Sequence, residues 1–273
     1  MGKFDGVLIC TDLDGTLFRK DKTVSTENRE AIEYFKREGG YFTFVTGRMP
    51  NYSMTAYRAV NPNVPFGAVN GGALYDGATG EYVWTTPMTE DPTELIKSID
   101  VVLPAVSIQV CTMNTTYFAK NTDMTERFRQ VTGLPNIERS YLEIDEPIAK
   151  IIFGTDYEEE MQAVINILAE HPLSQRFDFI RSERKLFEIL PKGVHKGRAL
   201  LKLANYLGVD PKRTVAVGDY YNDVPMLRAA GVGVAVSNAC DAAKEAADFI
   251  TASNEEHAIA HVIRDIESKK ISL

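Results

Sequence analysis

The amino-acid sequence predicts an α/β protein in which a doubly wound, parallel, Rossmann-like core carries an inserted α+β domain. Near both ends of the chain, apolar runs of strand length alternate with amphipathic helical stretches, which is typical of a parallel sheet covered on both faces. In the middle, short strands come in pairs separated by polar turns, which indicates antiparallel pairing. We therefore expect a core domain from residues 1–83 and 191–273 and an inserted domain from residues 84–190.

Three apolar runs open the chain, with helical stretches between them. The first helix should begin at Ser25 or Thr26 and end at Gly39-Gly40. Each apolar run ends on polar residues or glycine: Val7–Thr11 on Asp12-Leu13-Asp14-Gly15-Thr16, Tyr41–Val45 on Thr46-Gly47-Arg48, and Phe66–Val69 on Asn70-Gly71-Gly72. This order of elements predicts the first strands of the parallel sheet.

The remaining elements follow from the same patterns. In the inserted domain we expect strand pairs Ser107–Thr112 with Thr116–Lys120 and Phe177–Ile180 with Leu186–Leu190, a strand Ala149–Gly154, and helices Asp123–Val131 and Glu158–Glu170. The α/β pattern then returns, with a helix His195–Leu207 that Gly208 ends, strands Thr214–Val217, Val232–Val236 and Asp248–Ile250, and a last helix Glu255–Ser268.

Composition narrows the class of protein. A net charge of -8 over 273 residues argues against a nucleic-acid partner and against docking on an anionic membrane. No apolar run approaches the ~20 residues of a membrane span, and the first residues do not resemble a signal peptide. The three cysteines, Cys10, Cys111 and Cys240, form no CxxC motif and predict neither a disulfide framework nor a zinc site. We expect a cytoplasmic enzyme, monomeric or weakly dimeric.

Polar side chains gather at one edge of the predicted sheet. Asp12 and Asp14 follow a buried strand, and two carboxylates this close favour a divalent metal or separate acid and base roles. An Asx turn leaving the strand is the alternative for this pair. Lys196 stands at a helix start, where a cation is disfavoured, and Asp219 repeats the pattern of an acid directly after a strand. With Thr46, these clusters predict one site.

The combination resembles the haloacid dehalogenase superfamily of phosphotransferases over the whole chain. The matching motifs are DLDGT at Asp12–Thr16, Thr46 in VTGR, Lys196 in PKGVHKG, and GDYYND at Gly218–Asp223. Asn70-Gly71-Gly72 and the large insertion between the second and third motifs are similar to the Cof-type branch (subfamily IIB), which has its α/β cap there.

The resemblance implies a phosphatase that needs Mg²⁺ and acts on a small phosphorylated metabolite, most commonly a sugar phosphate. Asp12 would be the nucleophile that forms an aspartyl-phosphate, and Asp14 the general acid and base. Asp12, the backbone carbonyl of Asp14 and Asp219 would hold the metal. The groups implied to contact the phosphoryl group are Leu13, Thr46, Gly47, Lys196 and Asn222, with Asp223 orienting Lys196 or a metal-bound water.

Other functions stay open at this point. A phosphomutase on the same scaffold and a non-catalytic phosphate-binding module are the alternatives. His257 and His261 have metal-ligand spacing, but a solvated helix face explains them better, and there is no GxxxxGK[ST] nucleotide loop. Substrate choice is expected to lie with polar or aromatic cap residues, for which the sequence offers five candidates: Tyr117, Lys120, Lys150, Arg181 and Glu188.

Overall fold

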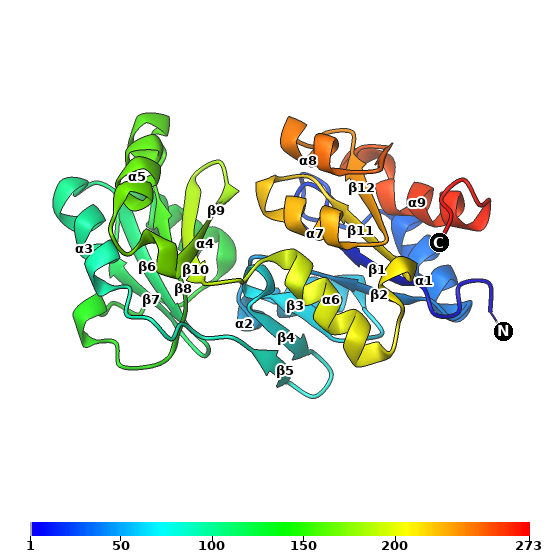
Figure 1. Cartoon of the computed structure of the whole chain (residues 1–273), viewed down its shortest axis with the longest axis horizontal. Coiled ribbons are helices and arrows are strands. Elements are labelled where there is room, and N and C mark those ends of the chain that lie inside the picture. Colours follow the sequence, from blue (N-terminus) through cyan, green and yellow to red (C-terminus); the bar gives the residue numbers. More distant parts are fainter. Residues whose placement is uncertain (1) are drawn as a thin grey trace. The chain divides into compact units, whose positions relative to one another are not determined.

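The structure is a computed structural model that describes residues 2–273, and in it the chain forms two compact units (Figure 1). One unit takes the chain up to Thr85 together with His195–Leu273, and the other is Thr86–Val194. The predicted α/β class with an antiparallel insertion is confirmed. That residues 84–190 form a separate domain stays a prediction. None of the helices in residues 2–273 is long and apolar enough to cross a membrane.

A parallel sheet with strand order β13-β12-β11-β1-β2 forms the centre of the first unit. Its strands are β1 (Leu8–Thr11), β2 (Tyr41–Phe44), β11 (Thr214–Gly218), β12 (Val232–Val236) and β13 (Phe249–Thr251). Every residue of β1, β11 and β12 is buried, as expected for parallel strands with both faces covered.

In this unit α1 packs against α9, and α7 packs against both α6 and α8. The bounds are α1 (Thr26–Arg37), α2 (Pro50–Val60), α6 (Lys196–Leu207), α7 (Val224–Ala229), α8 (Asp241–Ala246) and α9 (Ala258–Glu267). The Ser25 hydroxyl caps α1 by accepting a hydrogen bond from the Asn28 N–H, and Gly208 ends α6 in the left-handed conformation, at φ 68°. The predicted helix starts at Ser25 and near Lys196 are therefore confirmed.

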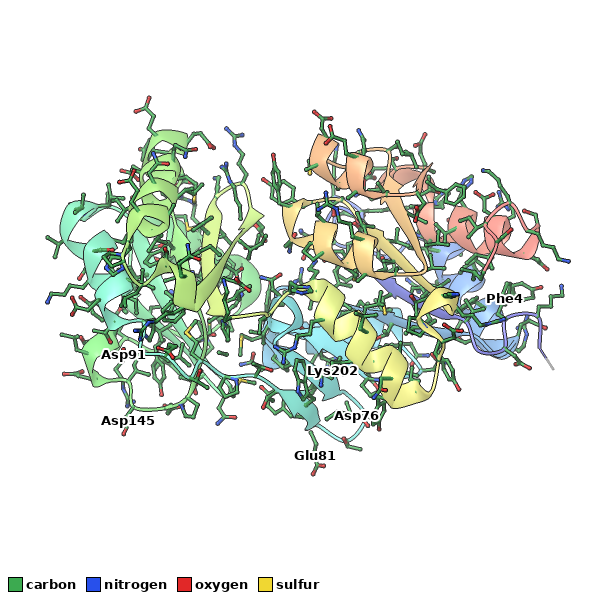
Figure 2. All side chains as sticks on the ribbon, viewed as in Figure 1. Phe4, Asp76, Glu81, Asp91, Asp145 and Lys202 are labelled. Atoms are coloured by element: carbon green, nitrogen blue, oxygen red, sulfur yellow. The ribbon has the colours of Figure 1, made fainter. Side chains whose placement is uncertain are left out.

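The sheet predicted for the third strand was wrong. Phe66–Val69 was expected in the parallel sheet, but β3 (Phe66–Ala68) lies in a separate antiparallel sheet with β4 (Ala73–Asp76) and β5 (Glu81–Thr85). It touches the parallel sheet through one bridge, Val45 to Gly67. That bridge is parallel, but the turn after β3 sends the chain straight back, so all three residues of β3 pair with β4 in a hairpin. Glu81, at the start of β5, points away from the ribbon (Figure 2).

The sheet topology brings two distant acidic motifs together. From β1 the chain winds toward β2, whereas β11, β12 and β13 follow one another on the other side of β1. The winding direction therefore reverses between β1 and β11, and open α/β sheets bind ligands at the carboxyl side of such a switch point. Thr11 pairs with Val217, and the Asp12 N–H donates to the Val217 carbonyl at 2.8 Å.

The second unit is an antiparallel sheet with strand order β7-β6-β8-β10-β9 and helices along it. All five predicted strands and both predicted helices are confirmed, while α3, which lacks a side-chain cap, was not predicted. The bounds are α3 (Thr93–Val102), β6 (Ser107–Thr112), β7 (Thr116–Lys120), α4 (Asp123–Thr132), β8 (Ile148–Gly154), α5 (Glu158–Glu170), β9 (Phe177–Glu183) and β10 (Leu186–Pro191). Its apolar core joins α3 and α5 to one face of the sheet.

Candidate active site

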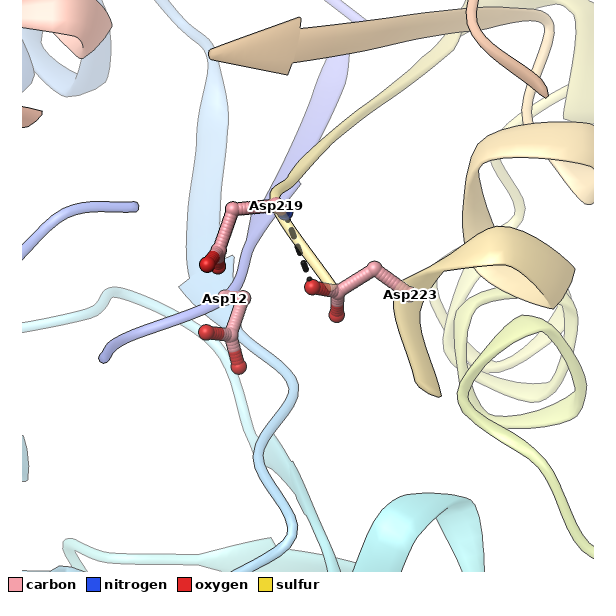
Figure 3. Close-up of side chains that lie close together, drawn as sticks. All are labelled: Asp12, Asp219 and Asp223. Atoms are coloured by element: carbon pink, nitrogen blue, oxygen red, sulfur yellow. Dashed lines mark hydrogen bonds between the residues drawn. The ribbon is translucent and has the colours of Figure 1, made fainter. Parts of the chain in front are cut away.

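Three carboxylates converge at the switch point of the parallel sheet. Asp12 follows β1, Asp219 follows β11, and Asp223 ends a short 3₁₀ turn, Tyr221–Asp223. One oxygen from each lies within 4.8 Å of the others, and Figure 3 shows the three side chains close together, with the hydrogen bond between Asp219 and Asp223 as a dashed line. The structure thus brings the first and last motifs together, as the sequence predicts.

Lys196 lies beside this cluster although it is the first residue of α6. Only 1% of its surface is exposed, and its Nζ lies 2.5 Å from Asp12 Oδ1 and 2.6 Å from Asp223 Oδ1. Burial alone would lower the pKa of Lys196, but these two carboxylates raise it above its ordinary value, so the ammonium stays charged.

Asp223 is bound on its other side by the backbone. Its Oδ2 accepts hydrogen bonds from the N–H groups of Asp219 and Tyr220, at 2.9 and 3.0 Å. Both of its oxygens therefore have partners within the protein. This arrangement matches the predicted role of Asp223 in orienting Lys196 better than that of a first metal ligand.

The charge balance of the cluster suits a divalent cation. Burial raises the pKa of Asp12 well above its ordinary value, outweighing Lys196, and the charges of Asp223 and Asp219 raise it further. Burial, and then the charge of Asp223, raises the pKa of Asp219 to about 7. Two buried carboxylates and the half-buried Asp219 thus lie around one lysine, and hard oxygen donors with excess negative charge are what Mg²⁺ binds. Asp12 and Asp219 are the residues that fit as its side-chain ligands.

Asp219 is also held in place from the first motif. The Thr16 hydroxyl donates to Asp219 Oδ1 at 2.7 Å. A Cβ on Gly15, whose φ is +86°, would lie 2.5 Å from Asp219 Oδ2, so a side chain at this position would strain the backbone and displace Asp219. The contacts of Gly15 and Thr16 with Asp219 therefore explain why these two residues stand in the first motif.

Asp14 has two cationic partners that sequence reasoning did not assign. Arg48 Nη2 lies 2.8 Å from Asp14 Oδ1 and 2.7 Å from Oδ2, and Lys22 Nζ lies 2.7 Å from Oδ1. Burial would raise the pKa of Asp14, but Arg48 and then Lys22 outweigh it and hold the pKa below its ordinary value. The signal in the sequence was Arg48 in the second motif, next to Thr46-Gly47 at the same sheet edge.

The predicted phosphoryl-binding residues come from several segments of the first unit. Thr46 is buried, and its hydroxyl accepts a hydrogen bond from the Arg48 N–H at 3.3 Å. The Asn222 side-chain amide donates to Asn70 Oδ1 at 3.1 Å. The Leu13 side chain is fully buried, so only its backbone can take the predicted part in phosphate binding.

The histidines have other roles. His195 Nδ1 accepts a hydrogen bond from the Arg198 N–H at 3.2 Å and so caps α6. His257 directly precedes α9, and its Nδ1 lies 3.4 Å from Oε2 of Glu27 in α1. Among residues 2–273, neither His257 nor His261 belongs to a cluster of three metal-ligating side chains.

The five candidates in the second unit divide between the two faces of its sheet. Residues directly opposite each other on neighbouring strands share a face. Tyr117, Lys120 and Arg181 pair with residues of the apolar core, and Arg181 binds Glu158 of α5. Lys150 and Glu188 lie on the opposite face, where they form a buried ion pair of 2.8 Å.

Gln109 is a buried polar residue on that same opposite face that sequence reasoning missed. It pairs with Ile152, which also pairs with Glu188. Neither its amide nitrogen nor its amide oxygen has a hydrogen-bond partner in the described part of the chain. A buried amide without partners costs free energy, so this position is a candidate for contact with a polar ligand.

A parallel sheet with an aspartate–lysine cluster at its switch point defines an α/β enzyme. The chain belongs to the haloacid dehalogenase-like hydrolase family, whose model matches residues 9–263. It is 30% identical over 268 residues to the putative phosphatase YxeH of Bacillus subtilis (strain 168), covering 95% of this chain and 97% of that protein.

Two further comparisons agree. The chain is 28% identical over 264 residues to the 5-amino-6-(5-phospho-D-ribitylamino)uracil phosphatase YitU of the same organism, covering 94% of this chain and 96% of that one. It resembles the structure of BT4131, a sugar phosphatase of HAD subclass IIB, with a TM-score of 0.83 and 20% identity over 95% and 98% of the two chains. The predicted family and the enzyme class, phosphoric monoester hydrolase, are confirmed.

Proposed function

We propose that this phosphatase hydrolyses a small phosphate monoester in two steps, through an aspartyl-phosphate on Asp12. The observation that carries the proposal is the contact of 2.5 Å between the Asp12 carboxylate and the buried, charged Lys196, at the switch point of the sheet. A carboxylate attacks a dianionic phosphate only where positive charge balances both groups, and this position supplies it.

In the first step an Asp12 oxygen forms a bond to phosphorus while the bond from phosphorus to the ester oxygen breaks. The electron pair goes to the leaving oxygen, which takes a proton from the Asp14 carboxyl group. In the second step a water attacks the same phosphorus and gives its proton to the Asp14 carboxylate. The bond from phosphorus to Asp12 then breaks, and inorganic phosphate and the free Asp12 carboxylate are regenerated.

The side chains around Asp12 keep their charges during both steps. Lys196 stabilises negative charge on Asp12 and on the transferring group, while Asp223 holds the ammonium in position. When bound by Asp12 and Asp219, Mg²⁺ would supply the further positive charge that brings the dianionic phosphoryl group to a carboxylate. The proposed donors to the phosphoryl oxygens are the backbone amides of Gly47 and Leu13 and the side chains of Thr46 and Asn222.

The ion pair of Asp14 with Arg48 and Lys22 affects its proposed roles as base and as acid differently. Bound to Arg48 and Lys22, the carboxylate is deprotonated and suited to accept a proton from water. Donating a proton to the leaving oxygen requires this ion pair to loosen in the first step. We propose that substrate binding, which brings a second anion to Arg48 and Lys22, loosens it.

For the substrate we propose a phosphorylated sugar or sugar-alcohol derivative, because proteins similar to this chain are named as phosphatases of such compounds. Residues 84–190 would act as a cap that selects it. Within that segment, the sheet face with Gln109, Lys150 and Glu188 offers an amide, a cation and an anion for a polar metabolite.

The test is phosphate release from a panel of phosphorylated sugars and sugar alcohols, with and without Mg²⁺. Asp12→Asn keeps the shape of the side chain and should abolish turnover, whereas Asp76→Asn in the β4–β5 hairpin is the matched control and should not. Acid quenching during turnover of a ³²P-labelled substrate should trap label on wild-type protein and none on Asp12→Asn. Near-normal turnover by Asp12→Asn would exclude the covalent mechanism, and transfer of the label to a second sugar without phosphate release would indicate a mutase.

A further inference from the structure

The segment Val69–Gly71, directly after β3, has an unusual backbone. Its three residues have φ of 55°, 50° and 95° in turn. A positive φ is costly for a β-branched residue such as Val69. Strain of this kind persists only where the surroundings hold it, and it gathers at functional sites.

Backbone contacts tie the turn to two of the motifs. The Asn70 N–H donates to the Thr46 carbonyl and the Val69 N–H to the Arg48 carbonyl, both at 3.0 Å. A Cβ on Gly71 would lie 2.1 Å from the His195 carbonyl oxygen and 3.0 Å from the Lys196 nitrogen. The strained turn thus packs between the second motif and the start of α6.

The side chain of Asn70 points into the same region and is only 1% exposed. Its Oδ1 accepts a hydrogen bond of 3.1 Å from the Asn222 side-chain amide. A Cβ on Gly47 would lie 3.0 Å from Asn70 Oδ1 and 3.1 Å from its Nδ2, so the carboxamide lies directly against Gly47. Asn70 therefore touches two of the residues that are proposed to hold the phosphoryl oxygens.

We propose that Asn70 is a positioning residue that holds Gly47 and Asn222 together, so that their N–H groups meet the transferring phosphoryl group at once. The inference rests on the proposed function. Donors that are fixed before reaction need no reorganisation when charge develops, so their placement affects the transition state more than substrate binding. The positive φ of the turn is the cost of bringing this carboxamide between the two motifs.

Asn70→Gly is the variant that separates the side chain from the backbone. Glycine accepts the φ of 50° without strain, so the variant should melt at or above the temperature of the wild type. Loss of the carboxamide should lower kcat by about 10²-fold, because small misplacements of binding groups have effects of that order. KM for the ester should change by less than about 3-fold, since the ester keeps its other contacts.

Asn61→Gly is the matched control. Asn61 is also an asparagine with a positive φ, 51°, but it is the exposed C-cap of α2. This variant should keep the wild-type kcat. A double-mutant cycle gives a second readout: adding Asn70→Gly to Asn222→Ala should cost a smaller factor in kcat than Asn70→Gly costs alone. Independent, multiplicative losses would overturn the positioning role.

Calorimetric binding of inorganic phosphate in the presence of Mg²⁺ gives a readout without turnover. Inorganic phosphate lacks the ester's leaving group and depends on the phosphoryl donors alone, so it should bind more weakly to Asn70→Gly than to the wild type and to Asn61→Gly. If Asn70→Gly keeps wild-type kcat and phosphate affinity while Asp12→Asn is inactive, the inference is wrong and the proposed function stands. If the wild type hydrolyses no ester, the proposed function is wrong, and the phosphate affinities alone decide the role of Asn70: equal values overturn it and weaker binding supports it.

Discussion

Both carboxylate oxygens of Asp14 accept hydrogen bonds from Arg48, with Nη2 at 2.8 Å from Oδ1 and 2.7 Å from Oδ2 and Nε at 3.0 Å from Oδ2. A planar guanidinium that binds both oxygens fixes the orientation of the carboxylate as well as its charge. The ring of Tyr52 lies 4.7 Å from the guanidinium and supports it from the side. Arg48 thus fixes the orientation in which the Asp14 carboxylate faces any proton donor or acceptor.

Arg48→Gln should move the acidic limb of the pH–rate profile to higher pH. Arg48 holds the pKa of Asp14 below its ordinary value, so its removal raises that pKa, and the deprotonated form needed as a base is then lost at higher pH. The measurement is kcat against pH. Arg58→Gln, at the exposed end of α2, is the control and should leave the profile unchanged. An acidic limb that does not move in Arg48→Gln would separate Asp14 from the rate-limiting proton transfer.

Lys196→Ala should lower kcat by roughly 10²–10³-fold, and Lys196→Arg by less, because the lysine stabilises charge that grows during transfer. The loss should be large because Asp12 and Asp223 would be left facing each other without a cation.

His195→Ala is the neighbouring control for Lys196. It removes the cap of α6, at a cost of about 1 kcal/mol in the free energy of unfolding, and should leave kcat nearly unchanged. Thermal melts and kcat measured on both variants test this division. Equal and small losses of kcat for the two would mean that Lys196 serves only the fold.

Asp219 should make the stability of the metal-free protein depend on pH near neutrality. Its pKa is raised from 3.8 to about 7, by burial first and then by Asp223. The folded state binds this proton more tightly, so the stabilisation is complete below pH 3.8 and is lost as the pH rises through about 7. The melting temperature without metal should therefore fall between about pH 4 and about pH 7 and level off at higher pH.

A divalent cation competes with that proton for Asp219. Added Mg²⁺ should therefore raise the melting temperature more at about pH 8 than at about pH 6. Asp219→Asn cannot ionise, so the contribution of this group to the pH dependence should disappear and the Mg²⁺ response should be weaker than in the wild type. The same Mg²⁺ response in the wild type and in Asp219→Asn would remove Asp219 from the metal site.

Replacing residues 84–190 by a short Gly/Ser linker should leave a folded core that binds Mg²⁺. The parallel sheet closes between segments on both sides of this insertion, since β1 pairs with both β2 and β11. Slow hydrolysis of p-nitrophenyl phosphate should survive, while discrimination among phosphorylated metabolites should collapse. A circular dichroism melt and kinetics with two substrates measure these outcomes. A core that does not fold alone would contradict the domain boundary, and unchanged discrimination would place specificity outside the insertion.

The periodic and local features of the chain were predictable from its sequence. Buried parallel strands appear as apolar runs, so β1, β11 and β12 were found together with the acids that follow them. Asp12 and Asp219 could be assigned to one site because the carboxyl ends of parallel strands meet at one sheet edge. Lys196 was marked by its unusual place at a helix start.

Contacts between distant segments were decided only by the tertiary structure. The sequence alone could not tell that β3 pairs back with β4, because the same apolar run fits a parallel or an antiparallel neighbour. The binding of Arg48 to Asp14 and the contact of Asn70 with Asn222 join residues far apart in the chain. The burial of the Gln109 amide, without a hydrogen-bond partner among the described residues, also depends on how the strands pack. Local patterns determine which element a residue belongs to, whereas the partner of a polar side chain depends on how the elements pack.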